Sequence, residues 1–369
     1  MSDTPNSVAT ARAKYNCPAC GADAHWNPAK QALICPFCGT ESPATLEKRG
    51  DETVIVEHDL VTALRTIPDD ARGWQASKTS VRCQSCQAIS VFDADKVGRR
   101  CDFCGSSQLL PYTEVKDVFR PESLLVMKVS ESQARDLIRA WYGSLWLAPN
   151  KLKSKALTDT VKGLYLPYWT FDAKVQASWS ADAGDYYTET GSNGKTVTRT
   201  RWHRVAGELS HFFDDELVPA SKGIHEQWLR GVEPFPTASL TPYDPGYLAG
   251  WTVERYQLDL VYAASKSRQQ MEAKLRSLCA AQIRADTHRN LQVQSTFSEQ
   301  RFKHILAPIW ILTYNYGQNC YQVLINGVTG KIAGGRPWSW VKIGILAVLG
   351  LLALLYFVGF NSSFDITIN

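Results

Sequence analysis

The sequence predicts two small zinc ribbons, β-rich and stabilised by metal, followed by an α+β domain and one C-terminal transmembrane helix. Three observations predict it: four C-x-x-C pairs within the first 104 residues, helical and strand-like periodicity in the middle, and an uncharged apolar run at residues 343–360. A chain of 369 residues has room for two or three domains. With 44% hydrophobic residues and a net charge of +4, the composition excludes fully disordered, collagen-like and mucin-like chains.

The cysteines of the N-terminal region form two sets with the same spacing. In each set, fourteen residues separate one C-x-x-C pair from the next. A C-x-x-C turn points two thiolates at one place, and a second such turn completes a tetrahedron around zinc. Four thiolates leave no position for a catalytic water, so we expect two structural zinc ions, one per ribbon. The predicted ligands are Cys17, Cys20, Cys35 and Cys38 in ribbon 1, and Cys83, Cys86, Cys101 and Cys104 in ribbon 2.

The two sets resemble each other beyond the cysteines, which indicates a duplicated unit. Gly39 and Gly105 directly follow the fourth cysteines, where a knuckle turn favours a residue that tolerates positive φ. Disulfides and thioredoxin-like redox pairs are the alternatives, but two identical frames favour zinc. We expect the aromatic member of each set to pack beneath the metal. At a constant offset of 66 residues, Ala22 matches Ala88, Trp26 matches Phe92 and Lys30 matches Lys96.

Composition divides the chain into segments around these ribbons. Residues 46–80 form a connector with a short helix started by Asp59, and residues 111–336 form the α+β domain. The other predicted boundaries are a disordered start at 1–13, ribbon 1 at 14–45, ribbon 2 at 81–110, a transmembrane helix at 341–360 and a non-cytoplasmic tail at 361–369.

Two helices are predicted in the 111–336 domain, each followed by strand-like sequence. Ser130 opens the first with Gln133 as a capping box, before the strand-like residues 163–179. Ser267 opens the second, before residues 305–332. Its inward face is expected to hold Met271, Leu275, Leu278 and Cys279. This order suggests a helix–sheet unit used twice, with a long polar hairpin between Tyr186 and Phe213.

The C-terminal apolar run predicts a single membrane span. Eighteen residues of helix are about 27 Å long, close to the thickness of the hydrocarbon core. Basic residues precede the run and Asp365 follows it, so the positive-inside rule places the N-terminal domains in the cytoplasm. The sequence therefore predicts a single-pass protein of the inner (cytoplasmic) membrane.

Together with the ribbons, three stretches resemble one bacterial family: GLYLPYWTFD (163–172), PYDPGYLAGWTVERY (242–256) and INGVTGKIAGGRPWS (325–339). It is a family of double zinc-ribbon, single-span membrane proteins, often labelled primosomal-helicase-like or transcription-factor-IIB-type zinc ribbon. The resemblance implies partners of the stomatin/flotillin (SPFH) or phage-shock-A type in membrane-stress systems. It implies an adaptor at the cytoplasmic face of the membrane and carries over no catalytic residue.

The same residues favour one class of function over two others. The leading prediction is a membrane-tethered adaptor whose knuckle loops contact a protein partner; these are Pro18–Ala19, Pro36–Phe37, Gln84–Ser85 and Asp102–Phe103. The alternative is nucleic-acid binding by the ribbons, although acids interrupt their basic residues. An enzyme is not expected: the sequence GSNGKT (191–196) has Glu189 where a phosphate-binding loop needs glycine. The sequence leaves the partner and the oligomeric state open.

Overall fold

A large β-sheet dominates the chain, which corrects the predicted α+β fold class. The computed structural model describes residues 17–41, 55–65, 78–86, 88–93, 100–112, 119, 121–149, 161–190, 195–316 and 319–364. Their strands form a two-stranded sheet and a twelve-stranded sheet, the latter in the order β10-β7-β12-β8-β11-β5-β4-β6 with β3, β9, β13 and β14 attached to it. The prediction was wrong because local periodicity indicates single strands. It does not show that ribbon 2 and the larger domain contribute strands to one sheet. The expected disordered start at 1–13 lies outside the described residues.

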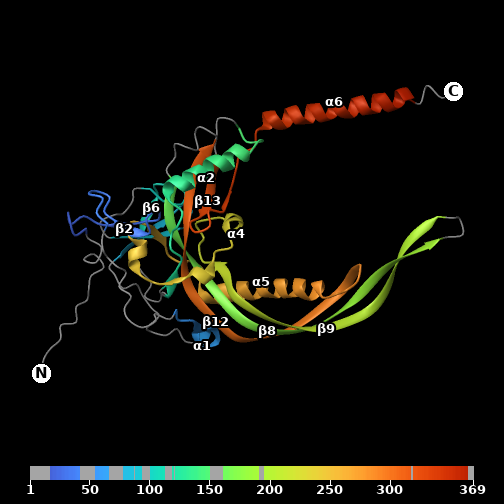
Figure 1. Ribbon diagram of the computed structural model, residues 1–369, viewed down its shortest axis with the longest axis horizontal. Helices are drawn as coiled ribbons and strands as arrows, with labels where there is room; N and C mark the ends of the chain where they lie inside the picture. The colour runs from blue at the N-terminus through green and yellow to red at the C-terminus, as the bar shows by residue number, and fades with distance from the viewer. Residues whose placement is uncertain are drawn as a thin grey trace.

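Three long antiparallel strands form the centre of this sheet and continue as a curved arm (Figure 1). They are β8 (Val161–Thr190), β9 (Thr196–Pro219) and β12 (Thr287–Tyr316), with β8 in the middle. β8 and β9 make the long hairpin that the sequence predicts. Side chains alternate between the two faces, so one face of the arm is buried and the other meets solvent.

Both predicted helices form, but the second begins earlier in the chain than expected. α2 (Glu131–Ser144) begins after Ser130, whose capping box with Gln133 is confirmed. α5 (Leu260–Ala281) begins seven residues before the predicted start, because the Asp259 carboxylate accepts the Tyr262 N–H and caps it there. Met271, Leu275 and Cys279 are buried as expected, whereas Leu278 is 37% exposed.

α5 lies in the concave side of the arm and covers its buried face (Figure 1). Its buried side chains pack on alternate residues of β8, from Ala173 to Ala181. A second core holds α2 against the part of β12 near Trp310, and a third fills the space between ribbon 2 and the sheet. Two of the three long strands follow a helix in sequence: α2 precedes β8 and α5 precedes β12.

The remaining elements are short and mostly connect the ribbons to the sheet. α1 (Leu60–Arg65) begins after Asp59, as predicted, with the Thr62 N–H donating to the Asp59 carboxylate at 2.7 Å. The others are β1 (His25–Asn27), β2 (Ala32–Ile34), β3 (His58–Asp59), β4 (Lys78–Cys83), β5 (Ile89–Asp93), β6 (Leu109–Tyr112), β7 (Ser123–Leu124), α4 (Glu226–Val232), η2 (Thr237–Ser239), β10 (Thr241–Pro242), η3 (Pro245–Leu248), β11 (Thr252–Glu254), β13 (Asn319–Asn326), β14 (Ile332–Gly334) and α6 (Trp340–Phe364).

The predicted transmembrane helix at 341–360 is corrected, and with it the single-pass placement in the inner membrane. Within the described part of the chain, no helix has both the length and the apolar character that a membrane crossing needs.

Candidate metal centres

The structure brings each predicted set of four cysteines to one point. In both sets the four Sγ atoms lie within 4.8 Å of one another, so each set could hold a metal ion. In ribbon 1, Sγ of Cys17 is 3.4 Å from Sγ of Cys38, and Sγ of Cys20 is 3.5 Å from Sγ of Cys35. The corresponding two distances in ribbon 2 are both 3.6 Å. The two clusters therefore share one geometry as well as one sequence frame.

The donor set and its spacing fit zinc. Sulfurs at 2.3 Å from a tetrahedral ion lie about 3.8 Å apart, close to the distances here, whereas a disulfide needs about 2.05 Å. No described cysteine forms a disulfide. The Thr40 hydroxyl lies 3.1 Å from Sγ of Cys38. This hydrogen bond is the main cause that lowers the pKa of the Cys38 thiol to about 6.

Both ribbons form their knuckle turns in the same way. The N–H of Cys35 donates to the carbonyl of Thr40, and that of Cys101 donates to the carbonyl of Ser106. The glycine after each fourth cysteine returns a hydrogen bond to the first cysteine of its pair. Gly39 and Gly105 have φ values of 73° and 75°, which confirms the predicted need for glycine there.

Ribbon 1 is attached to the rest of the chain through its hairpin. Trp26 of β1 is 6% exposed and belongs to the core around α2. Its ring meets Tyr247 edge-on with centroids 4.8 Å apart, and its Nε1–H donates to the Met127 carbonyl. Trp26 thus anchors the ribbon to the larger domain rather than packing beneath the metal as expected. The side chain of its counterpart, Phe92, lies outside the described residues.

Ribbon 2 is part of the large sheet. Its strand β5 pairs with β11, and β11 runs parallel to β8. The second knuckle of ribbon 2 inserts into the domain: Phe103 is fully buried. Its carbonyl accepts hydrogen bonds from Oγ1 of Thr313 at 2.7 Å and from Nε2 of Gln322 at 2.8 Å.

The neighbouring Asp102 strengthens this attachment. Its carboxylate pairs with the ammonium of Lys162 and accepts a hydrogen bond from the Thr252 hydroxyl. The knuckle of ribbon 2 is therefore held by one buried ring, two hydrogen bonds to its backbone and one partly buried ion pair. A knuckle with so many contacts inside the chain is closed to other molecules.

The same position in ribbon 1 has the opposite environment. Phe37, which matches Phe103 at the 66-residue offset, is 82% exposed. No hydrogen bond joins the Pro36–Phe37 knuckle to the sheet within the described residues. The two matching knuckles therefore differ in exposure: the ring of ribbon 1 meets solvent, and the ring of ribbon 2 does not.

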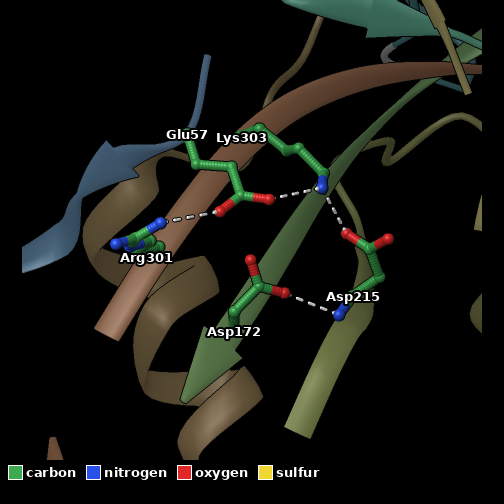
Figure 2. A network of polar contacts seen from close by, with 5 residues as sticks. All are labelled: Glu57, Asp172, Asp215, Arg301 and Lys303. Carbon is green, nitrogen blue, oxygen red and sulfur yellow. Dashed lines mark hydrogen bonds and ion pairs between the residues drawn. The ribbon is translucent and has the colours of Figure 1, made fainter. Parts of the chain in front are cut away.

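A third group of possible metal ligands lies at the base of the arm: Asp172, Asp214 and Asp215. Lys303 reaches into this group from β12 (Figure 2). Its ammonium is 2.7 Å from Oδ1 of Asp215 and 3.1 Å from Oε1 of Glu57, and its side chain is 6% exposed. A fixed ammonium already compensates the carboxylates, so the arrangement is an ion-pair network rather than a metal centre.

This network joins three strands, β8, β9 and β12, to the segment that precedes β3. Glu57, which directly precedes β3, also pairs with Arg301 at 3.4 Å, and the Asp215 N–H donates to Oδ1 of Asp172 at 2.6 Å (Figure 2). Burial raises the pKa of the Asp172 carboxyl to about 6. Sequence reasoning missed these residues because they are spread from position 57 to 303 and form no local motif.

Comparison with known proteins identifies one similar chain and no function. The uncharacterized protein YdjG of Bacillus subtilis (strain 168) is 23% identical over 358 residues, which cover 94% of this chain and 99% of YdjG. No family model matches the sequence, and no solved structure matches it. The likeness to YdjG extends over nearly the whole of both chains.

Proposed function

We propose that the protein is a zinc-ribbon adaptor that binds a protein partner through the second knuckle of ribbon 1. The observation that carries this proposal is the contrast between Phe37, 82% exposed, and Phe103, fully buried at the matching position. Two copies of one unit thus have different uses. Ribbon 2 completes the sheet, and ribbon 1 presents its knuckle to another molecule.

Zinc has a structural role in this proposal. The eight cysteines would hold two ions, each within a closed set of four thiolates. Bound zinc fixes the knuckle turns, so the Phe37 ring is presented without the entropic cost of ordering a flexible loop. We expect metal analysis of the purified chain to find two zinc ions, and one after Cys83→Ser.

The docked knuckle of ribbon 2 indicates the kind of surface that would receive Phe37. Phe103 occupies an apolar site on the sheet while a hydroxyl and an amide donate to its carbonyl. A partner that offers an apolar pocket with hydrogen-bond donors at its edge would bind the Phe37 knuckle in the same manner. A surface of this kind is typical of a protein partner and not of the phosphate backbone of a nucleic acid. SPFH-type and phage-shock-A-type proteins, implied by the family resemblance, are the first candidates.

The test compares Phe37→Asp with the wild-type chain in cells of the source organism. After chemical crosslinking, we expect a stoichiometric protein partner with the wild type and at least a tenfold loss of it with Phe37→Asp. A charged carboxylate cannot enter an apolar pocket without a large desolvation cost. Zinc content and thermal stability should not change, because the replaced ring is exposed.

Val261→Asp is the matched control. Val261 lies in the first turn of α5 and is 65% exposed, so the same change of an apolar side chain to a carboxylate is made away from ribbon 1. This variant should recover the partner in full. Equal recovery with Phe37→Asp would overturn the proposal. Nucleic acid that stays bound in moderate salt, with no protein, would favour the alternative function.

A further inference from the structure

The outer edge of β9 is long, and no strand of the described residues pairs with it. β9 has 24 residues and pairs with β8 from Pro219 to Thr196. Among the described residues, no strand pairs with its other side. A free edge of this length presents a row of unpaired backbone groups, which soluble proteins normally shorten, cover or pair with another chain.

Two charges in the middle of β9 also lack partners within the described residues. Arg204 and Glu208 are both exposed, and neither makes a hydrogen bond or an ion pair there. Some of the neighbouring charges pair within the chain. Arg199 contacts Glu189 at 2.6 Å on the neighbouring strand, and Glu216 contacts Lys274 of α5 at 2.6 Å. Arg204 and Glu208 are two opposite charges on one edge strand.

We propose that two copies of this chain pair through β9, antiparallel and about a twofold axis at Ala206. Arg204 and Glu208 each lie two residues from Ala206, on opposite sides of it. The twofold axis therefore places Arg204 of each copy directly opposite Glu208 of its partner. Residues opposite one another in an antiparallel pair share a face, so both ion pairs form on the solvent face of the arm.

Two exposed aromatic residues lie on that same face of β9. Trp202 is 36% exposed and Phe212 is 55% exposed. In the proposed register Trp202 faces Ser210 of the second copy, and its diagonal neighbour is Phe212 of that copy. Aromatic side chains reach across this diagonal, so the pairing covers apolar surface that a single chain leaves in water.

The side chains of β9 do not obstruct the pairing. Val205 and Leu209 pack on the core under α5. The side chains of paired strands stand on the two faces of the sheet, so none lies between the two backbones. In this twofold pair residues 196–216 of β9 in both copies face each other, which gives a closed dimer rather than a fibre.

Sedimentation of the full chain tests the proposal through charge reversal. In a neutral detergent that keeps the apolar α6 in solution, we expect a dimer at micromolar concentration. Arg204→Glu sets two like-charged pairs across the axis and should raise the dissociation constant about tenfold or more, and Glu208→Arg should do the same. The double variant restores opposite charges and should return the constant to within about threefold of the wild type.

Arg276→Glu is the control, since Arg276 is exposed on α5 and outside the proposed contact. It should leave the dimer unchanged. Three results would overturn the proposal. The wild type could be a monomer, both single reversals could leave the dissociation constant unchanged, or the double variant could dimerise as weakly as the single variants. Because only β9 pairing makes the double variant recover, the test separates this dimer from association through α6.

Discussion

At the scale of single residues, burial rather than sequence decides what two matching side chains do. Phe37 and Phe103 occupy the same position in the second knuckle of their ribbons. Yet Phe37 is 82% exposed and Phe103 is fully buried. The sequence frame predicts the turn and its glycine, because those depend on neighbouring residues. It cannot predict the burial, because the site around Phe103 is built by Thr313 and Gln322, more than 200 residues away.

A residue-scale prediction concerns Asp172 in the ion-pair network. Its folded-state pKa of about 6 lies above the ordinary aspartate value, so folding favours the protonated form and stability falls as pH rises toward 6. Asp172→Asn removes the buried charge and keeps an oxygen for the Asp215 N–H. We expect this variant to be more stable than the wild type at pH 7.5, by about 1–2 kcal/mol, and equal to it near pH 4.

Chemical denaturation at the two pH values measures this difference. Asp214→Asn is the matched control, because Asp214 is exposed on the adjacent strand and its charge stays hydrated. A gain for Asp172→Asn that is the same at pH 4 and pH 7.5 would show that the buried charge is not its cause.

At the scale of elements, the two ribbons differ in how they join the sheet. Ribbon 2 joins by strand pairing through β5 and β11, and ribbon 1 joins by packing of Trp26. β11 has only three residues, Thr252–Glu254, and its sequence gives no sign that it connects a metal-binding unit to β8. Helix starts and the long hairpin are local features and could be predicted. Sheet order depends on contacts between distant segments and could not.

Because the two ribbons join the sheet differently, we expect the loss of each metal site to affect the sheet unequally. In Cys86→Ser, ribbon 2 loses a ligand and β5 loosens, so we expect the amides of β11 to exchange with solvent at least tenfold faster. In Cys20→Ser, ribbon 1 loosens while β11 keeps both neighbours. Hydrogen exchange read by mass spectrometry distinguishes the two variants. Equal protection of β11 in both would contradict the view that ribbon 2 supports the sheet.

At the scale of the whole molecule, the two proposals use separate parts of the chain. The first assigns the Pro36–Phe37 knuckle of ribbon 1 to a protein partner, and the second assigns the edge of β9 to a second copy of the chain. A dimer would carry two such knuckles, and partners that are themselves multimeric would then bind with increased avidity. Neither surface uses the buried core, so each can be changed without loss of the fold.

The most direct measurement is photo-crosslinking in cells from the two matching knuckle positions. A benzophenone-bearing phenylalanine replaces Phe37 in one chain and Phe103 in another, and both chains are illuminated and purified. We expect position 37 to form a covalent adduct with one partner protein and position 103 to form crosslinks only within its own chain. No protein adduct from position 37, or the same adduct from both positions, would contradict the account.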